Sequence, residues 1–185
     1  MKFIIIKKTF NDSKMLIDIL KNLLGMNIKY EENDKYLIIF HDYYNDDDIV
    51  KVLNSLGDDL MINIVAYLSS PLFMSKSKEE QSVILPILDN NQLKSGVYNL
   101  KSLLLERPTI NNKRQLLNFI LDSSGVDESF VRDFALNNLN VSKASKATYI
   151  HRNTMIYKLD KLKDISGFDL RLFLDAYILF GLIEK

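Results

Sequence analysis

Residues 141–162 carry the side chains best suited to recognising another molecule. The stretch reads as two short helices separated by a tight bend at Tyr149-Ile150, and the second helix opens with His151-Arg152-Asn153-Thr154. Arg forms bidentate hydrogen bonds to guanine, Asn forms them to adenine, and Thr contacts a thymine methyl group or a phosphate. Proteins present such groups to the DNA major groove on a helix that follows a short helix and a bend. The pattern therefore predicts a helix-turn-helix at about residues 141–163.

Basic side chains surround these groups. Six positions within residues 141–163 are basic and one, Asp160, is acidic, whereas the whole chain has 24 basic and 24 acidic residues. Lysines of this kind are suited to phosphates, which fix the register of a protein on DNA and make its affinity salt-dependent. For the charge cluster alone, the alternative is a solvated helix face. The predicted DNA-binding residues are Ser142, Lys143, Lys146, His151, Arg152, Asn153, Thr154, Tyr157, Lys158 and Lys161.

Several of these residues also suit a structural role. Ser142 is expected to cap the first helix, and His151 either caps the second helix or faces DNA. Arg152 and Lys158 are alternatively ordinary surface charges. Tyr157 either reaches DNA or packs against the C-terminal helix.

No motif in the sequence indicates a catalytic centre. The chain has no cysteine, no Gly-x-Ser-x-Gly and no glycine-rich phosphate loop, and its two histidines, His41 and His151, lie far apart. The acidic runs at 46–48 and 58–59 are typical of helix caps and solvated loops. We therefore predict that the protein is not an enzyme and has no catalytic residue, metal site or cofactor.

The recognition residues need a core that fixes the two helices. Small residues in the first helix allow the second to approach closely, and Met155, Leu159 and Leu162 recur at helical spacing as an inward stripe. The last helix, predicted at 169–184, is apolar on nearly all sides and must be buried on most of them. Its partner is either its own domain or, in part, a second copy of the chain.

The remaining sequence predicts an α+β protein. Its front portion has the order βαββαβ, which indicates a small sheet with helices on one face. Ser77 and Glu80 are spaced as a capping box for a helix that runs to Leu93 and contains Pro86, and from Val97 onward only helices are expected. The predicted organisation is an α/β regulatory or dimerisation module at 1–70, a helical connector at 71–96, and an all-α domain with the helix-turn-helix at 97–185. The predicted strands are 2–6, 28–30, 36–40 and 60–68, and the predicted helices are 15–24, 47–56, 97–106, 112–122, 127–138, 142–148, 152–164 and 169–184.

Residues 140–170 resemble the C-terminal helix-turn-helix of PucR-type (CdaR-like) transcriptional regulators. The resemblance lies in an Asn-Val start, a helix of small residues, His-Arg-Asn-Thr, a Tyr-basic-Leu step and a Ser-Gly-x-Asp-Leu tail. It implies a sequence-specific DNA-binding transcriptional regulator, with a regulatory module ahead of the DNA-binding domain. The alternative is an interaction or scaffold protein whose helix-turn-helix no longer binds DNA. The matching residues are Asn140, Val141, His151, Arg152, Asn153, Thr154, Tyr157, Leu159, Ser166, Gly167, Asp169 and Leu170.

The expected partners follow from this resemblance. They are double-stranded DNA, a second copy of the chain in a homodimer, and an unidentified small-molecule effector. The longest apolar run, 176–183, is too short to span a membrane, and the start of the chain lacks the apolar core of a signal peptide. We therefore expect a cytoplasmic protein that does not bind a membrane.

Overall fold

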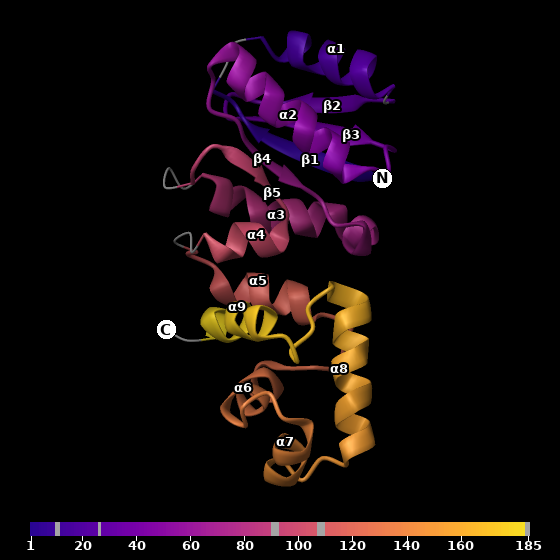
Figure 1. Cartoon of the computed structure of the whole chain (residues 1–185), viewed down its shortest axis with the longest axis vertical. Coiled ribbons are helices and arrows are strands. Elements are labelled where there is room, and N and C mark those ends of the chain that lie inside the picture. Colours follow the sequence, from indigo (N-terminus) through magenta and orange to yellow (C-terminus); the bar gives the residue numbers. More distant parts are fainter. Residues whose placement is uncertain (10–11, 26, 90–92, 107–109, 184–185) are drawn as a thin grey trace. The chain divides into compact units, whose positions relative to one another are not determined.

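The computed structural model describes residues 1–9, 12–25, 27–89, 93–106 and 110–183. The chain divides into two compact units, Met1–Thr109 and Ile110–Lys185. The first unit holds the sheet, and the described residues of the second form helices without a strand (Figure 1). The predicted α+β class, a small βαββαβ module followed by an all-α helix-turn-helix domain, is thus confirmed.

The first unit is built on one five-stranded sheet. The strand order is β2-β3-β1-β4-β5, and all neighbours are antiparallel except β4 and β5, which are parallel. The elements are β1 (Lys2–Lys7), α1 (Ser13–Leu24), β2 (Lys29–Glu32), β3 (Tyr36–His41), α2 (Asp46–Leu60), β4 (Val65–Leu68), the 3₁₀ helix η1 (Pro71–Lys76), α3 (Ser77–Leu88), β5 (Gly96–Tyr98) and α4 (Leu100–Leu105).

The two helices of the predicted βαββαβ module, α1 and α2, cover one face of this sheet as predicted, and α3, from the predicted connector, covers the other face. Ile4 and Ile6 of β1 join the core cluster formed with α1 and α2. Tyr67 of β4 points the other way, and its hydroxyl donates a 2.7 Å hydrogen bond to the Glu80 carboxylate of α3. Because neighbouring residues of a strand alternate between faces, a strand buried on both sides is apolar throughout, as the Phe3-Ile-Ile-Ile6 run is.

The predicted capping box of Ser77 and Glu80 is wrong, because Glu80 is hydrogen-bonded to Tyr67 instead. Ser77 is the first residue of α3 rather than its cap, and Glu80 is fully buried. Its Oε1 accepts hydrogen bonds from the Tyr67 hydroxyl and from the backbone N–H of Ser70. Burial raises the pKa of Glu80 to about 7, although both hydrogen bonds lower it. Glu80 therefore ties α3 to the sheet instead of closing its own helix. Helix α3 ends at Leu88, so its predicted end at Leu93 is wrong; Leu93 is not helical, and residues 90–92 lie outside the described part.

Further elements differ from their predicted bounds; the strand predicted at 60–68 begins only at Val65, and Leu60 belongs to α2. Residues 97 and 98, expected to begin a helix, instead belong to β5, which pairs with β4 in a contact that local sequence does not encode. Helix α4 begins only at Leu100, where Asn99 and Ser102 form a capping box. Helix α2 continues past Gly57, its predicted end, to Leu60, and Met61 ends it in the left-handed conformation with φ of 52°.

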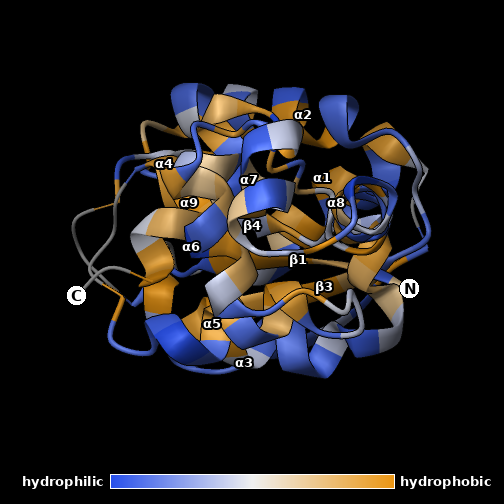
Figure 2. Cartoon of the chain, turned by 90° about the horizontal axis from the view of Figure 1, so that it is seen from below, coloured by the Kyte–Doolittle hydropathy of each residue, from blue (hydrophilic) through white to orange (hydrophobic). Residues whose placement is uncertain are grey.

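The second unit contains the predicted recognition helices. Its elements are α5 (Lys113–Leu121), α6 (Glu128–Leu136), α7 (Val141–Ala147), α8 (Arg152–Ser166) and α9 (Phe173–Ile183). Helix α9 packs against α5 and α6 and begins four residues later than predicted, because Asp169–Leu172 form a turn. Figure 2 shows the hydrophobic colouring of α9.

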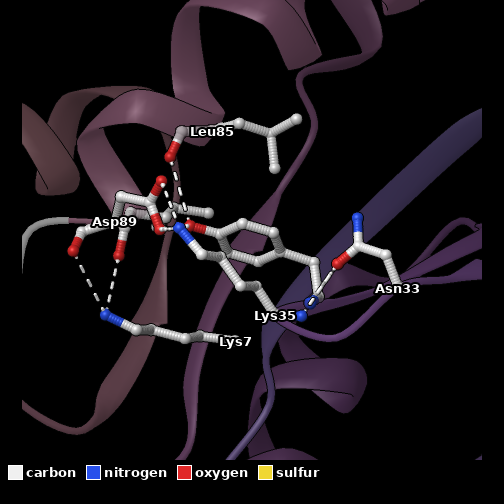
Figure 3. A network of polar contacts seen from close by, with 7 residues as sticks. Lys7, Asn33, Lys35, Leu85 and Asp89 are labelled. Carbon is white, nitrogen blue, oxygen red and sulfur yellow. Dashed lines mark hydrogen bonds and ion pairs between the residues drawn. The ribbon is translucent and has the colours of Figure 1, made fainter.

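A polar network fastens the end of α3 to the sheet in the first unit (Figure 3). The Asp89 carboxylate accepts a 2.8 Å hydrogen bond from the buried Tyr36 hydroxyl and pairs with the Lys35 ammonium at 3.2 Å. Lys7 of β1 donates to the carbonyl of Leu88. The hydrogen bond from Tyr36 and the charge of Lys35 hold the pKa of Asp89 below its usual value. This end of α3 is thus held to both β1 and β3.

Candidate nucleic-acid interface

Helices α7 and α8 form the predicted helix-turn-helix. The two are joined by residues 148–151, and α7 lies beside the N-terminal end of α8 (Figure 1). Ala144 of α7 is fully buried, and so are Met155, Leu159 and Leu162 of α8. The predicted stripe therefore faces the core of the unit, and the small side chain of Ala144 lets the two helices approach.

The cap of α7 differs from the prediction. Asn140, not Ser142, is the N-cap, and its side-chain oxygen accepts a 3.0 Å hydrogen bond from the backbone N–H of Lys143. Ser142 lies in the first turn with its side chain exposed. At the other end of α7, the Thr148 hydroxyl donates a 2.8 Å hydrogen bond to the Ala144 carbonyl, which satisfies this half-buried polar group.

His151 caps α8, as one of its two predicted roles required. Its Nδ1 accepts a 3.2 Å hydrogen bond from the backbone N–H of Asn153, and its carbonyl accepts one from Met155. The imidazole is exposed. The cap fixes where the helix begins, and therefore which side chains occupy its first turn.

The first turn of α8 presents the predicted base-reading groups to solvent. Arg152, Asn153 and Thr154 are all exposed, and Tyr157, one turn further on, is 64% exposed. Among the described residues, none forms a hydrogen bond or an ion pair with the Arg152 guanidinium. These groups stand at a helix N-terminus, where the helix dipole and the free N–H groups favour a negatively charged ligand.

The lysines of the cluster differ in their surroundings. Lys143 and Lys146 of α7 are exposed, and Lys161 of α8 is half-buried. Lys158 is used inside the unit: its ammonium donates a 2.6 Å hydrogen bond to the Gly125 carbonyl and lies 5.4 Å from the centre of the Phe130 ring. Lys163 lies 3.8 Å from the Asp169 carboxylate. The two lysines of α7 are therefore the best placed to meet a phosphate backbone.

Two acidic side chains lie on the C-terminal half of the outer face of α8. Positions 153, 157, 160 and 164 share the outer face of α8 because they are three or four residues apart. Asn153 and Tyr157 occupy its first half, and Asp160 and Asp164 its second. The carboxylate of Asp164 repels phosphate, whereas that of Asp160 is paired with Arg171, so the first two turns of α8 are the part of this face best suited to DNA.

Ion pairs of Arg171 hold the segment after α8 in place. Its guanidinium pairs with Asp169 at 2.7 Å and with Asp160 at 2.8 Å. Hydrogen bonds from Arg171 hold the pKa of Asp169 below its usual value, although partial burial opposes this. Gly167 ends α8 in the left-handed conformation, with φ of 77°, which favours glycine. The Ser-Gly-x-Asp-Leu residues thus set the turn from α8 to α9.

One residue of this surface was not predicted. Tyr149, in the turn between α7 and α8, is 97% exposed and has φ of 55°, a left-handed conformation that is unusual for an aromatic residue. Sequence reasoning placed the bend at Tyr149 but left its side chain out of the predicted set. A tyrosine at a tight bend, where Gly or Asn is usual, was the available signal.

No group of three His, Cys, Asp or Glu residues suited to a metal ion occurs within the described residues. No described helix has the length and apolar character needed to cross a membrane.

Comparison with known proteins agrees with the geometry. Residues 130–180 match the family model of the PucR C-terminal helix-turn-helix domain. The chain is similar to a solved structure, the regulator of polyketide synthase expression from Bifidobacterium adolescentis, with 17% identity over 98% of this chain and 77% of that chain and a TM-score of 0.48. No curated protein matches the chain. The helix-turn-helix within residues 130–180 is therefore similar to the C-terminal domain of PucR-type regulators.

Proposed function

We propose that this protein is a sequence-specific DNA-binding transcriptional regulator. The observation that carries the proposal is the exposure of Arg152, Asn153 and Thr154 in the first turn of α8, within a domain of the PucR helix-turn-helix family. In a helix-turn-helix, the N-terminal residues of the second helix contact base edges while the first helix crosses the DNA backbone. In this arrangement the exposed residues of α8 contact base edges, and those of α7 lie at the DNA backbone.

The proposed roles follow the chemistry of each side chain. Arg152 and Asn153 read base edges, and Thr154 and Tyr157 contact a thymine methyl group, a sugar or a phosphate. His151 positions this turn through its cap. Tyr149, at the bend before the first turn of α8, adds a contact to the DNA backbone.

The phosphate contacts come mainly from α7. Lys143 and Lys146 are exposed there with Ser142, and Lys161 adds a half-buried ammonium from α8. These contacts hold the register of α8 in the groove. We assign Lys158 to the interior instead, because its ammonium is already bound to the Gly125 carbonyl.

The finer parts of the function remain predictions. We expect a cytoplasmic homodimer in which residues 1–70 have a regulatory or assembly role and respond to a small-molecule effector. Two copies would place two recognition helices on two half-sites of an operator.

Two observations favour the alternative, a scaffold protein with a helix-turn-helix that does not bind DNA. The ammonium of the half-buried Lys158 is bound to the Gly125 carbonyl, and Asp160 and Asp164 lie on the outer face of α8. A DNA-binding protein still keeps three lysines for phosphates, which corresponds to a salt slope of about −3 per copy of the chain. The alternative predicts no salt-dependent binding.

The experiment that separates these functions is a salt titration of the purified full chain on random duplex DNA, followed by selection of bound sequences from a random pool. For a dimer with six phosphate contacts, affinity should fall by about 10³-fold between 50 and 200 mM salt. The selected sequences should converge on one motif. Absence of binding at 50 mM salt refutes the proposal and supports the scaffold, and binding without convergence refutes sequence specificity.

A further inference from the structure

Large apolar side chains gather on the exposed side of α6 and α9. Phe173 is 72% exposed, Leu136 67%, Leu174 55% and Tyr177 39%. Single exposed apolar residues are ordinary, but a contiguous group of them marks an interaction surface. We call this surface the α6–α9 face; it consists of Leu136, Leu139, Phe173, Leu174, Tyr177 and Phe180.

The α6–α9 face contains both a hollow and projecting side chains. A groove of about 430 Å³ lies between α6 and α9, lined by residues that include Leu139, Ala176 and Phe180. Phe173 and Tyr177 stand at its edge with their rings stacked at 6.0 Å between centroids. The loop that closes the groove is held in an uncommon conformation, with φ of 59° at Asn138 and 55° at Leu139.

No exposed residue of α9 is charged, although the Lys113 ammonium of α5 lies 3.4 Å from the Gly181 carbonyl. Within Phe173–Ile183 the residue that is charged at neutral pH is Asp175, which is 4% exposed and accepts a hydrogen bond from the backbone N–H of Asp169. A surface that bears one sign of charge repels its own copy, whereas an uncharged one does not. Cores of protein interfaces are likewise depleted of charge and enriched in Phe and Tyr.

We propose that two copies of the chain associate through their α6–α9 faces. A two-fold interface brings the same surface together twice, so each copy must offer both the projection and the hollow that receives it. Here both lie on one face: Phe173 of each copy enters the groove of the other and lies against Leu136 there.

The size of the face suits a second copy. At the exposures above and about 200 Å² for each large side chain, the four most exposed residues offer about 450 Å². A stable interface buries about 800 Å² on each partner, of which the apolar centre is a part and a polar rim the rest. The α6–α9 face is therefore large enough for the centre of a dimer interface.

This inference names the surface behind the expected dimer, and its test requires no DNA. The mass of the full chain is measured by sedimentation equilibrium from about 0.1 to 100 µM, for the parent and for Phe173→Glu. The matched control is Tyr44→Glu, since Tyr44 is a 92% exposed aromatic residue of the first unit. Phe173→Glu should weaken dimerisation by at least about 30-fold, the effect of losing an interface hot spot, and Tyr44→Glu should leave it unchanged. Circular dichroism checks that each variant is folded.

A rescue experiment tests the predicted cross-contact. Leu136→Lys should also dissociate the dimer, and an equimolar mixture with Phe173→Glu should restore it, because the new carboxylate and ammonium would meet across the interface. A parent chain that is monomeric at 100 µM, a Phe173→Glu dimer of parental affinity, or a mixture that stays monomeric would overturn the proposal. Loss of DNA binding by an intact dimer would count against the proposed function and leave this interface standing.

Discussion

Replacement of Lys158 by alanine separates a structural lysine from a DNA-binding one. Its ammonium joins α8 to the loop that precedes α6, through the 2.6 Å hydrogen bond to the Gly125 carbonyl and the contact with the Phe130 ring. A hydrogen bond from a charged group contributes about 1.5–3 kcal/mol and an exposed cation–π contact about 0.5–1 kcal/mol. Ordering the long side chain costs about 1.5–2 kcal/mol, and the site is partly open to water. The expected loss of unfolding free energy is therefore about 1–2 kcal/mol.

The assay is urea unfolding of the full chain, monitored by circular dichroism, beside a salt titration of DNA binding. Lys146→Ala is the matched control, because Lys146 is an exposed lysine of α7. It should change stability by less than about 0.5 kcal/mol but reduce the salt slope by about 1 per copy of the chain. Lys158→Ala should do the reverse. A Lys158→Ala variant of parental stability, with a salt slope reduced by about 1 per copy of the chain, would refute the structural role of Lys158.

Three further predictions concern stability. Burial raises the pKa of Glu80 to about 7, above an unfolded value of about 4.3, so the free energy of unfolding should fall by on the order of 3 kcal/mol as pH rises between these values. Glu80→Gln should remove this fall, and Glu79→Gln at an exposed position should keep it; the same dependence of unfolding free energy on pH in the Glu80→Gln variant and the parent would contradict the reasoning. Arg171 lowers the pKa of Asp169, so the stabilisation by Asp169 is present above its unfolded pKa of about 3.9 and is lost as pH falls through its folded pKa. Asp169→Asn should weaken the loss of stability in acid, and an unchanged dependence of unfolding free energy on pH would argue against the Arg171–Asp169 ion pair as its cause. Leu159 is fully buried, so Leu159→Ala should lower the free energy of unfolding by about 2–5 kcal/mol in a denaturant titration, whereas Tyr157→Ala on the exposed face should lower it far less. Equal losses would show that the inward face of α8 is wrongly assigned.

Local patterns were sufficient to predict the helix-turn-helix. The stripe of Met155, Leu159 and Leu162 has the period of a helix, and it is buried as that period requires. Once the inner face of α8 is known, the exposed face follows by rotation about the helix axis. The polar residues before Met155 also indicated where α8 begins, and His151 caps it there.

Contacts between distant residues account for most of what was missed. Strand β5 has three residues and is defined by pairing with β4, some thirty positions earlier. Glu80 has the spacing of a capping residue, yet Tyr67 and Ser70 bind it from other elements. Lys158 looks like a phosphate ligand until Gly125, 33 positions away, is brought beside it. A single sequence carries no local signal for such pairs, since their energy exists only in the assembled fold.

The choice of Asn140 over Ser142 as the cap of α7 shows a finer limit. Both residue types are good caps, and they lie two positions apart. Which one caps depends on where the chain leaves the helical conformation, and here Asn138 and Leu139 turn it just before Asn140. Sequence patterns fix such boundaries only to within a few residues.

The most direct test of base reading by α8 uses the DNA sequence selected by the parent protein. Affinity is measured at one fixed salt concentration for this sequence and for each of its single-base variants, with the parent chain and with Arg152→Ala. Loss of a bidentate contact should weaken binding by about 1–3 kcal/mol and abolish discrimination at one base pair in each half-site, leaving the other positions discriminated as before. An Arg152→Ala protein that still discriminates at every position as the parent does would contradict the assignment of the first turn of α8 to the major groove.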